Sequence, residues 1–337
     1  MTFKVGVTRD LLRADGTPAF DSRAFAELDA NPAIVWEWLP EDVREITPEI
    51  AAAYDALHVN LPLVTAASVA RQDCRLKVVA RNGVGYDSCD IPALTAKGIL
   101  LTNTPVAVRR PVAVAALTMI FALAGRLLKK NEIVRQGRWN DRTLYMSQGL
   151  TGRTLGVIGA GSIGKELLAL ARPFFRSMIA ADPYVDAATL TPLGAALLPL
   201  DDVLRHADYV VVACLLTPET HHLLDETRLR LMKPSAYLVN MARGPIVDEA
   251  ALARVLAAGG FLGAGLDVTE REPIETDSPL LAMDNVIITP HALCWTDECF
   301  YDIAATALRS IADVSLARRP AHVVNADAYD VPPQRLR

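Results

Sequence analysis

Cysteine is scarce in this sequence, and the few cysteines form no recognisable pattern. There are five among 337 residues, an odd number, and no two of them make a C-x-x-C pair. This pattern excludes a disulfide framework and provides no zinc-ligand motif. We therefore predict a reducing, cytoplasmic environment and no metal site.

Blocks of like charge and long apolar segments are also missing. Lysine and arginine total 34 against 39 acidic residues, and no basic block exceeds a pair, which argues against a nucleic-acid partner. Residues 1–7 lack the apolar core of a signal peptide. The longest apolar segment, residues 112–125, is interrupted only by Thr118 and is shorter than the roughly 20 residues that span a bilayer. We predict a buried helix there, with Pro111 in its first turn, and no membrane partner.

Short β-rich segments alternate with helix-like segments in both halves of the chain. In the first half the predicted strands cover residues 3–7, 34–38, 56–59, 76–80 and 99–101. After residue 152 they cover residues 155–158, 178–181, 209–213, 237–239, 262–266 and 286–288. This alternation predicts an α/β protein with two doubly wound parallel-sheet domains.

The predicted domain boundaries follow from where this alternation stops. It breaks near residue 105, so we predict a first domain over residues 1–104 and a second over residues 105–295. Residues 296–337 contain a well-patterned helix, with Thr296 as its cap and apolar residues from Phe300 to Val314 at helical spacing. We expect this helix to return to the first domain, where its apolar face can be buried.

A glycine-rich segment directly follows the predicted strand 155–158. It reads Gly159-Ala-Gly-Ser-Ile-Gly164 and leads into a predicted helix. Such glycines permit a tight turn and a close approach of backbone to a pyrophosphate, and the helix N-terminus favours the phosphate charge. Asp182 ends the next strand, where a carboxylate can accept hydrogen bonds from ribose hydroxyls and repel a 2′-phosphate. The sequence therefore predicts a dinucleotide site that prefers NAD to NADP.

Three titratable or charged residues lie after later strands of the second predicted domain. They are Arg243, Glu272 and His291. A guanidinium matches the geometry of a carboxylate, and an imidazole beside a carboxylate is a workable proton donor and acceptor near neutral pH. Because parallel strands open their ligand crevice at their carboxyl ends, these residues predict the catalytic site. His206, His221 and His222 lack such a context and are expected to face solvent.

The order of these motifs resembles the D-isomer-specific 2-hydroxyacid dehydrogenase family. The resemblance extends from the loop at residues 82–87 through the glycine-rich segment to residues 243–249, 267–273 and 289–291. It implies a flavodoxin-like substrate domain, a Rossmann cofactor domain and a homodimer formed through an arm after the long helix. The implied reaction transfers hydride between C2 of a D-2-hydroxyacid, or its 2-oxoacid, and the nicotinamide of NAD.

The resemblance also implies roles for individual residues. Arg243 would bind the substrate carboxylate and carbonyl, His291 would be the acid/base, and Glu272 would orient and charge His291. The backbone groups implied to hold the substrate carboxylate are those of Gly83, Val84 and Gly85. The implied cofactor contacts are Gly159, Gly161, Ser162, Ile163, Gly164, Asp182, Thr217, Ala242 and Asp267.

Several features stay open at the level of sequence. Arg81, Arg109 and Arg110 either contact a distal anionic group of the substrate or are ordinary surface charge. Trp295 adds a bulky aromatic residue near the expected pocket. Residues 112–116 lack the Glu that is common in the family, and Leu215 stands where Pro is usual. Two other functions compete on the same fold, an NAD(H)-sensing corepressor-like interaction protein and a phosphite-type dehydrogenase.

Overall fold

The computed structural model describes residues 2–331, and the chain divides into two compact units. The first unit combines residues 2–108 with residues 295–331, and the second unit is residues 109–294. The chain passes from the first unit to the second between Val108 and Arg109, four residues beyond the predicted boundary. It lies inside one continuous helix, so no break in the sequence pattern marks it.

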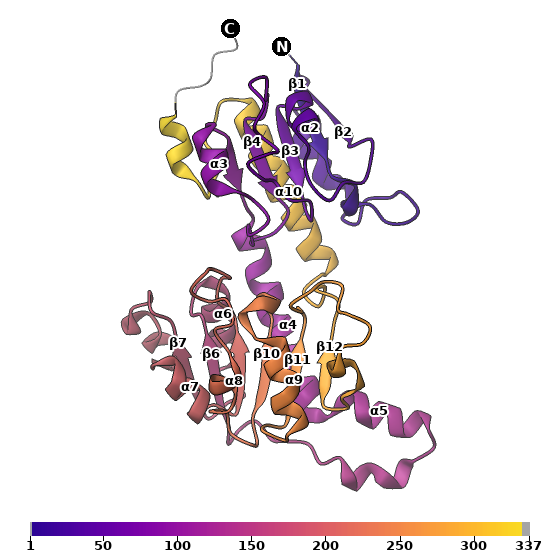
Figure 1. Cartoon of the computed structure of the whole chain (residues 1–337), viewed down its shortest axis with the longest axis vertical. Coiled ribbons are helices and arrows are strands. Elements are labelled where there is room, and N and C mark those ends of the chain that lie inside the picture. The colour runs from indigo at the N-terminus through magenta and orange to yellow at the C-terminus, as the bar shows by residue number, and fades with distance from the viewer. Residues whose placement is uncertain (1, 332–337) are drawn as a thin grey trace. The chain divides into compact units, whose positions relative to one another are not determined.

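A five-stranded parallel sheet forms the centre of the first unit, with strand order β2-β1-β3-β4-β5 (Figure 1). The strands are β1 (Phe3–Val7), β2 (Ile34–Trp38), β3 (Ala56–Val59), β4 (Val78–Arg81) and β5 (Leu100–Thr102). The helices are α1 (Ala26–Asp29), α2 (Pro48–Ala53), α3 (Ile91–Ala96) and α10 (Asp297–Ser315), with 3-10 turns η1 (Arg9–Leu11), η2 (Ser22–Phe25) and η8 (Ala326–Asp330). This strand order is that of flavodoxin-like folds, as predicted.

Helix α10 joins the C-terminal part of the chain to the first unit. Its predicted cap is confirmed, because the Thr296 hydroxyl accepts a hydrogen bond from the Cys299 N–H at 3.1 Å. The predicted apolar stripe, which includes Phe300, Leu308 and Ile311, is buried in one cluster with residues of β1, β3 and β4. Burial of this stripe removes its apolar surface from water, which is the main force that holds the helix in place.

A seven-stranded parallel sheet forms the second unit, with strand order β12-β11-β10-β9-β6-β7-β8. The strands are β6 (Thr154–Ile158), β7 (Ser177–Ala181), β8 (Ala195–Leu197), β9 (Tyr209–Val212), β10 (Tyr237–Asn240), β11 (Gly263–Leu266) and β12 (Val286–Ile288). This is the Rossmann order with a seventh strand added beyond β11. The prediction of six strands missed β8, a three-residue edge strand without any β-branched residue.

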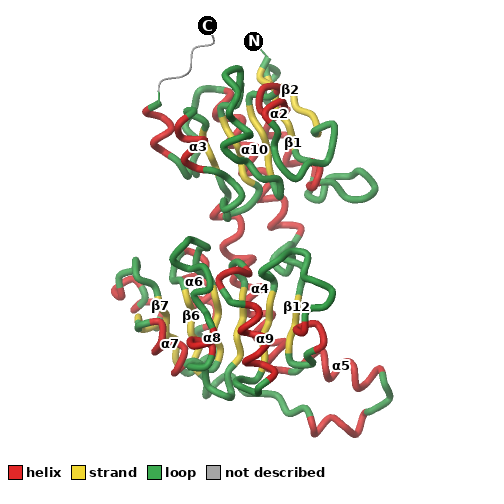
Figure 2. Tube along the Cα trace, viewed as in Figure 1, coloured by secondary structure: helices red, strands yellow, loops and turns green. Residues whose placement is uncertain are grey.

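Helices cover both faces of this sheet (Figure 2). One face packs against α4 (Pro105–Gly125) and α6 (Ser162–Ala171), and the other packs against α7 (Leu200–His206), α8 (Glu226–Leu229) and α9 (Glu249–Ala257). The remaining elements are α5 (Leu127–Arg135), η3 (Trp139–Leu144), η4 (Ala187–Thr189), η5 (Thr191–Leu193), η6 (Gly244–Ile246) and η7 (Pro279–Ala282). Because all seven strands run parallel, their carboxyl ends lie along the same side of the sheet.

Helix α4 begins earlier than its sequence suggests. It starts at Pro105 and not near Pro111, which lies inside the helix. Its 21 residues are long and apolar enough to span a membrane by length and composition, but its C-terminal half is part of the core of the second unit. Met119 packs so closely on β11 that a Cβ added at Gly265 would lie 2.2 Å from the Met119 Cγ. This half of α4 can therefore lie so close to the sheet only because Gly265 has no side chain.

Candidate active site

The three glycines after β6 each meet a different structural requirement. Gly159 has φ +94, and a Cβ there would lie 2.5 Å from the Cys214 N. At Gly164 a Cβ would lie 2.1 Å from the Gly159 carbonyl oxygen, so helix and strand can approach closely only without a side chain. A Cβ at Gly161 would meet no heavy atom within 4 Å. This position opens outward, where a pyrophosphate needs room close to the backbone.

The N-terminus of α6 and the end of β7 complete this part of the site. Gly161 is the N-cap of α6 and offers no side-chain hydrogen bond, so the first N–H groups of the helix, which include those of Ser162 and Ile163, suit a bound phosphate. Asp182 directly follows β7, and its two carboxylate oxygens accept hydrogen bonds from the Ala160 N–H at 2.8 Å and the Tyr184 N–H at 2.9 Å. Each oxygen can accept another hydrogen bond. These residues fit an adenosine dinucleotide.

Two other predicted cofactor residues lie beyond the neighbouring strands. Thr217 is in the turn after β9, where its N–H donates to the Thr220 hydroxyl at 2.7 Å. Ala242 follows β10, and its N–H donates to the Asn240 side chain at 3.1 Å. Because β9 and β10 lie side by side next to β6, both residues are at the same edge of the sheet as the glycine-rich turn.

The three predicted catalytic residues follow three adjacent strands. Arg243 comes after β10, Glu272 after β11 and His291 after β12. The His291 Nδ1 lies 2.9 Å from the Glu272 Oε2, and both side chains are about two-fifths exposed, at 41% and 42%. The other carboxylate oxygen of Glu272 accepts the Thr269 N–H at 3.3 Å. This arrangement orients the imidazole so that Nε2 is the nitrogen available for proton transfer.

Opposing influences determine the ionisation of Glu272. Partial burial acts to raise the pKa of this carboxyl. The hydrogen bond and charge of His291, the Thr269 N–H and the charge of Arg243 together outweigh burial and hold the pKa below its ordinary value. Glu272 is therefore a carboxylate at neutral pH, which stabilises positive charge on the neighbouring imidazole.

Asp267 has a structural task that the sequence did not reveal. Its side chain is 3% exposed, and its Oδ1 accepts hydrogen bonds from the Thr289 hydroxyl at 2.6 Å and from the N–H groups of Ala292 and Leu293, both at 3.1 Å. These donors surround His291, whose backbone has a φ of +53. A buried carboxylate with three donors is a strong anchor, so Asp267 holds the loop that presents the imidazole.

Gly244 sets the spacing between the Arg243 and Glu272 loops. A Cβ at Gly244 would lie 1.9 Å from the Thr269 carbonyl oxygen, a backbone atom of the Glu272 loop. The Arg243 carbonyl oxygen accepts the Asn240 side-chain N–H at 2.9 Å. Sequence reasoning missed Asn240, Gly244 and Thr269 as supporting residues. The glycine directly after the arginine was the available signal.

The predicted substrate loop belongs to the first unit and follows β4. Gly83 has φ +126, and its carbonyl oxygen accepts the Thr104 N–H at 3.0 Å. The Val84 carbonyl oxygen accepts the Asn103 side-chain N–H at 2.8 Å. With both carbonyl groups engaged, the N–H groups of Val84 and Gly85 are the groups of this loop suited to an anion. The Arg81 Nη1 lies 3.8 Å from the position of a Gly83 Cβ, beside the same loop.

A buried polar network, which no local sequence pattern predicted, supports this loop. The His58 Nε2 lies 3.0 Å from the Asn82 Oδ1, and the Asn82 amide donates to the Asn60 Oδ1 at 3.2 Å. The Asn60 amide in turn donates to Asp10 at 2.8 Å. Burial lowers the pKa of His58 to about 4, so it is neutral at physiological pH. The network fixes Asn82, the residue before Gly83, and its neutral histidine brings no positive charge to the loop.

The remaining open positions have simpler explanations. Arg109 and Arg110 both pair with Glu166 of α6, at 3.6 Å and 2.7 Å, which favours a structural role over a contact with a distal anion. Trp295 is 51% exposed, and its ring packs 4.6 Å from that of Phe300.

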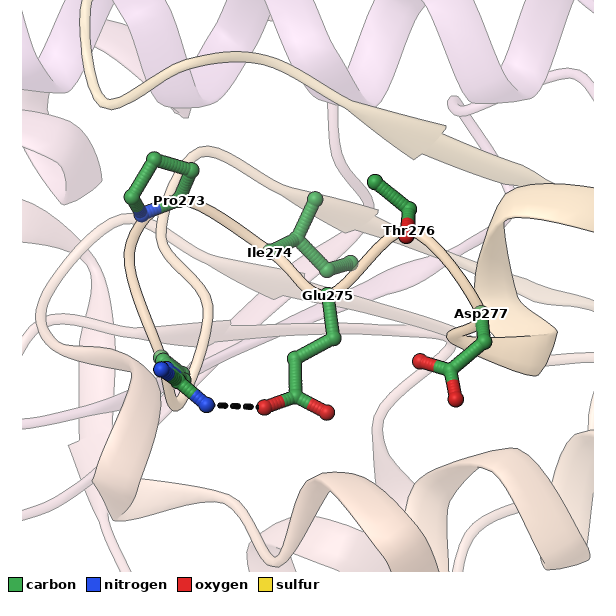
Figure 3. A pocket seen from close by; sticks show the side chains of 6 residues that line it. Pro273, Ile274, Glu275, Thr276 and Asp277 are labelled. Carbon is green, nitrogen blue, oxygen red and sulfur yellow. Dashed lines mark hydrogen bonds and ion pairs between the residues drawn. The ribbon is translucent and has the colours of Figure 1, made fainter.

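A surface hollow lies directly after Glu272. Figure 3 shows the side chains of Pro273, Ile274, Glu275, Thr276 and Asp277 around it, and Glu275 pairs with Arg271. One short segment of chain supplies the whole lining, and the hollow is open to solvent. We assign no ligand to it.

Comparisons with known proteins agree with this geometry. The sequence model described as D-isomer specific 2-hydroxyacid dehydrogenase, NAD binding domain, matches residues 117–292. Glyoxylate reductase from Thermococcus onnurineus is 36% identical over 303 residues, which cover 88% of this chain and 90% of that protein. A solved glyoxylate reductase from Paecilomyes thermophila has a TM-score of 0.84 at 26% identity and covers 96% of this chain and 98% of its own. D-lactate dehydrogenase from Aquifex aeolicus, solved with NAD and lactic acid, has a TM-score of 0.82 at 27% identity. The match covers 96% of this chain and 99% of that protein.

These matches confirm three predictions made from the sequence. The α/β fold with two parallel sheets is shown by the structure and its solved neighbours. The matched NAD-binding domain lies within the second unit, where the glycine-rich turn fits a dinucleotide. The oxidoreductase class follows from the named relatives. The chain belongs to the D-isomer specific 2-hydroxyacid dehydrogenase family.

Proposed function

We propose that this protein transfers hydride between C2 of a small D-2-hydroxyacid, or its 2-oxoacid, and the nicotinamide of NAD. The observation that supports this most strongly is the His291–Glu272 pair at 2.9 Å, whose members follow β12 and β11, while Arg243 follows the next strand in the sheet, β10. Such a set combines a proton donor with a group that binds carboxylates. The named glyoxylate reductases among its relatives make glyoxylate the first substrate to test.

The cofactor and the side chains of the protein take different parts in the reaction, one handling the hydride and the other the proton. The bound reduced cofactor supplies the hydride, and its oxidised form accepts it. In reduction, the protonated His291 donates its Nε2 proton to the substrate carbonyl oxygen, which becomes the hydroxyl of the product. In oxidation, neutral His291 takes the proton of that hydroxyl. Glu272 stays ionised and stabilises the charged imidazole in both directions.

Substrate orientation is the task of two sets of donors. We propose that the Arg243 guanidinium forms hydrogen bonds with the substrate carboxylate and carbonyl oxygen, which fixes C2. For the loop that contains Val84 and Gly85, we propose backbone N–H groups as further donors to the carboxylate. Asp267 and Gly244 act indirectly, because they position the loops that carry His291 and Arg243.

A substrate panel tests this proposal. The full chain is supplied with NADH and a series of 2-oxoacids, glyoxylate first, while absorbance of the reduced nicotinamide is followed. We expect turnover with at least one 2-oxoacid and with the matching D-2-hydroxyacid in reverse. Turnover with phosphite alone would identify the phosphite-type enzyme. Binding of NADH without turnover of any acid would favour the interaction protein.

Asp182 should make the protein prefer NADH to NADPH. Its carboxylate can accept hydrogen bonds from ribose hydroxyls and repels a 2′-phosphate. We expect Asp182→Ser to reduce the ratio of kcat/KM for NADH to that for NADPH by about tenfold, equal to roughly 1.4 kcal/mol. Asp186→Ser is the control, because Asp186 is a nearby aspartate that also accepts a backbone N–H at 2.8 Å. Equal or better efficiency of the wild type with NADPH would contradict this assignment.

The arm formed by α5 and η3 should mediate a homodimer. It projects from the rest of the second unit in Figure 1 and exposes apolar side chains that have no partner in a monomer's core. These are Leu127, Leu128, Val134, Trp139, Leu144 and Met146. We expect light scattering to give the mass of two chains, and the double variant Trp139→Ser/Leu144→Ser to dissociate. Tyr184→Ser, which alters an aromatic residue that is 90% exposed elsewhere, should stay dimeric. If light scattering gave the wild type the mass of a single chain, the predicted dimer would be wrong.

A further inference from the structure

Two histidines and one glutamate form a cluster outside the residues assigned above. His221 and His222 lie in the loop between β9 and α8, and Glu270 lies in the loop after β11. Their potential ligand atoms all lie within 4.8 Å of one another. The sequence predicted solvent-facing histidines and no metal site. His221 is indeed exposed, whereas His222 is half-buried and paired with Glu270.

An unusual backbone conformation brings the two imidazoles together. Consecutive side chains in extended backbone point to opposite sides. His222 instead has a left-handed φ of +48. The rings of His221 and His222 consequently stack, with centroids 4.1 Å apart and planes inclined by 27°. Both rings therefore offer nitrogen atoms on the same side of the loop.

Main-chain hydrogen bonds hold this loop in place. The His221 N–H donates to the Thr217 carbonyl at 3.0 Å, and the His222 N–H donates to the Pro245 carbonyl at 2.8 Å. Glu270 is fixed as well, because one of its carboxylate oxygens accepts the Glu249 N–H at 3.1 Å while the other lies 2.7 Å from the His222 Nε2. The backbone of both histidines and the side chains of His222 and Glu270 are thus held before any ligand arrives, which lowers the entropy cost of binding.

The donor set indicates which ion would bind. Two imidazole nitrogens and one carboxylate oxygen are ligands typical of Zn²⁺ and its neighbours in the first transition row. Mg²⁺ and Ca²⁺ prefer oxygen ligands and are disfavoured by the two imidazoles. The His222 and Glu270 side chains are each 35% exposed, so an ion can enter from solvent and keep a water as its fourth ligand.

We propose that His221, His222 and Glu270 form a zinc-binding site on the second unit. The bound ion would replace the hydrogen bond between His222 and Glu270 and connect the loop after β9 to the loop after β11. The first of these loops contains Thr217 and the second contains Glu272. Binding of Zn²⁺ therefore stabilises the two segments that flank the cofactor and catalytic residues, and it does so whichever substrate the enzyme uses.

Calorimetric titration of the chelator-treated full chain with Zn²⁺ tests the site directly. We expect one ion per chain at this site. Loss of an outer-shell partner typically costs about 10- to 100-fold in metal affinity, so loss of a direct ligand in His221→Ala or Glu270→Gln should cost at least about tenfold. Zn²⁺ should also raise the unfolding midpoint of the wild type, because it binds the folded chain, and neither variant should show the full rise.

Two controls separate this site from other zinc ligands. His206→Ala removes a surface imidazole of α7 that makes no part of the cluster, and it should bind Zn²⁺ like the wild type. His291→Ala removes the only other histidine that pairs with a glutamate among residues 2–331, and it should leave the affinity of the proposed site unchanged. Circular dichroism of each variant verifies that it is folded.

Three results would overturn the proposal. The first is an absence of binding heat with Zn²⁺ up to about 1 mM. The second is an affinity that stays unchanged in either His221→Ala or Glu270→Gln, since a three-ligand site needs both. The third is a loss of zinc binding in His291→Ala alone, which would assign the ion to the catalytic pair.

Discussion

Replacement of His291 by alanine is expected to lower kcat for 2-oxoacid reduction by about 10²-fold or more, because a positioned general acid contributes about 10²- to 10⁴-fold. The variant should still bind NADH, since the glycine-rich turn and Asp182 lie at other strands of the sheet. Stopped-flow measurement of the hydride transfer step, with NADH binding measured separately, distinguishes the two effects. A kcat near that of the wild type would exclude His291 as the acid.

Glu272→Gln should fail in a different way. Glutamine keeps a hydrogen-bond acceptor for the His291 Nδ1–H at the 2.9 Å position, but it removes the negative charge that stabilises the protonated imidazole. Reduction requires that protonated form, so we expect appreciable activity at acidic pH and an alkaline limb of the rate profile that moves toward lower pH. The pH dependence of kcat measures this shift. An unmoved profile would show that Glu272 does not control the charge of His291.

Gly244→Ala is expected to cause the second large loss. The added Cβ would lie 1.9 Å from the Thr269 carbonyl oxygen, so the backbone around Arg243 or Glu272 must move. Overpacking of this kind typically costs about 1–3 kcal/mol of stability. A displacement near 1 Å in a catalytic loop can reduce the rate about 10²-fold. We therefore expect kcat/KM to fall by about that factor in a protein that remains folded.

A matched glycine provides the control for this variant. Gly125 lies at the end of α4, and a Cβ there would meet no heavy atom within 4 Å. Gly125→Ala should therefore keep wild-type activity and stability. If Gly244→Ala were equally harmless, the close contact between the Arg243 and Glu272 loops would not matter for catalysis.

Most of the fold and the positions of the reacting groups follow from local patterns in the sequence. Strand periodicity and the glycine-rich turn are local patterns, and each depends on residues within a few positions of one another. Arg243, Glu272 and His291 were predicted for a similar reason, because each lies in the segment that follows a predicted strand. The structure brings Glu272 and His291 into contact, while the roles of all three stay predictions until the variants are measured.

Other features depend on contacts between distant segments, so they are visible only in the folded chain. The strand β8 has weak β propensity and exists because it pairs with β7. Asp267 anchors residues more than twenty positions away, and His222 pairs with Glu270 across 48 positions. The sequence left two roles open for Arg109 and Arg110, and their ion pairs with Glu166 of α6 favour the structural one. No local pattern encodes such pairs, because their distances follow from how strands order within a sheet and how loops pack at its edge.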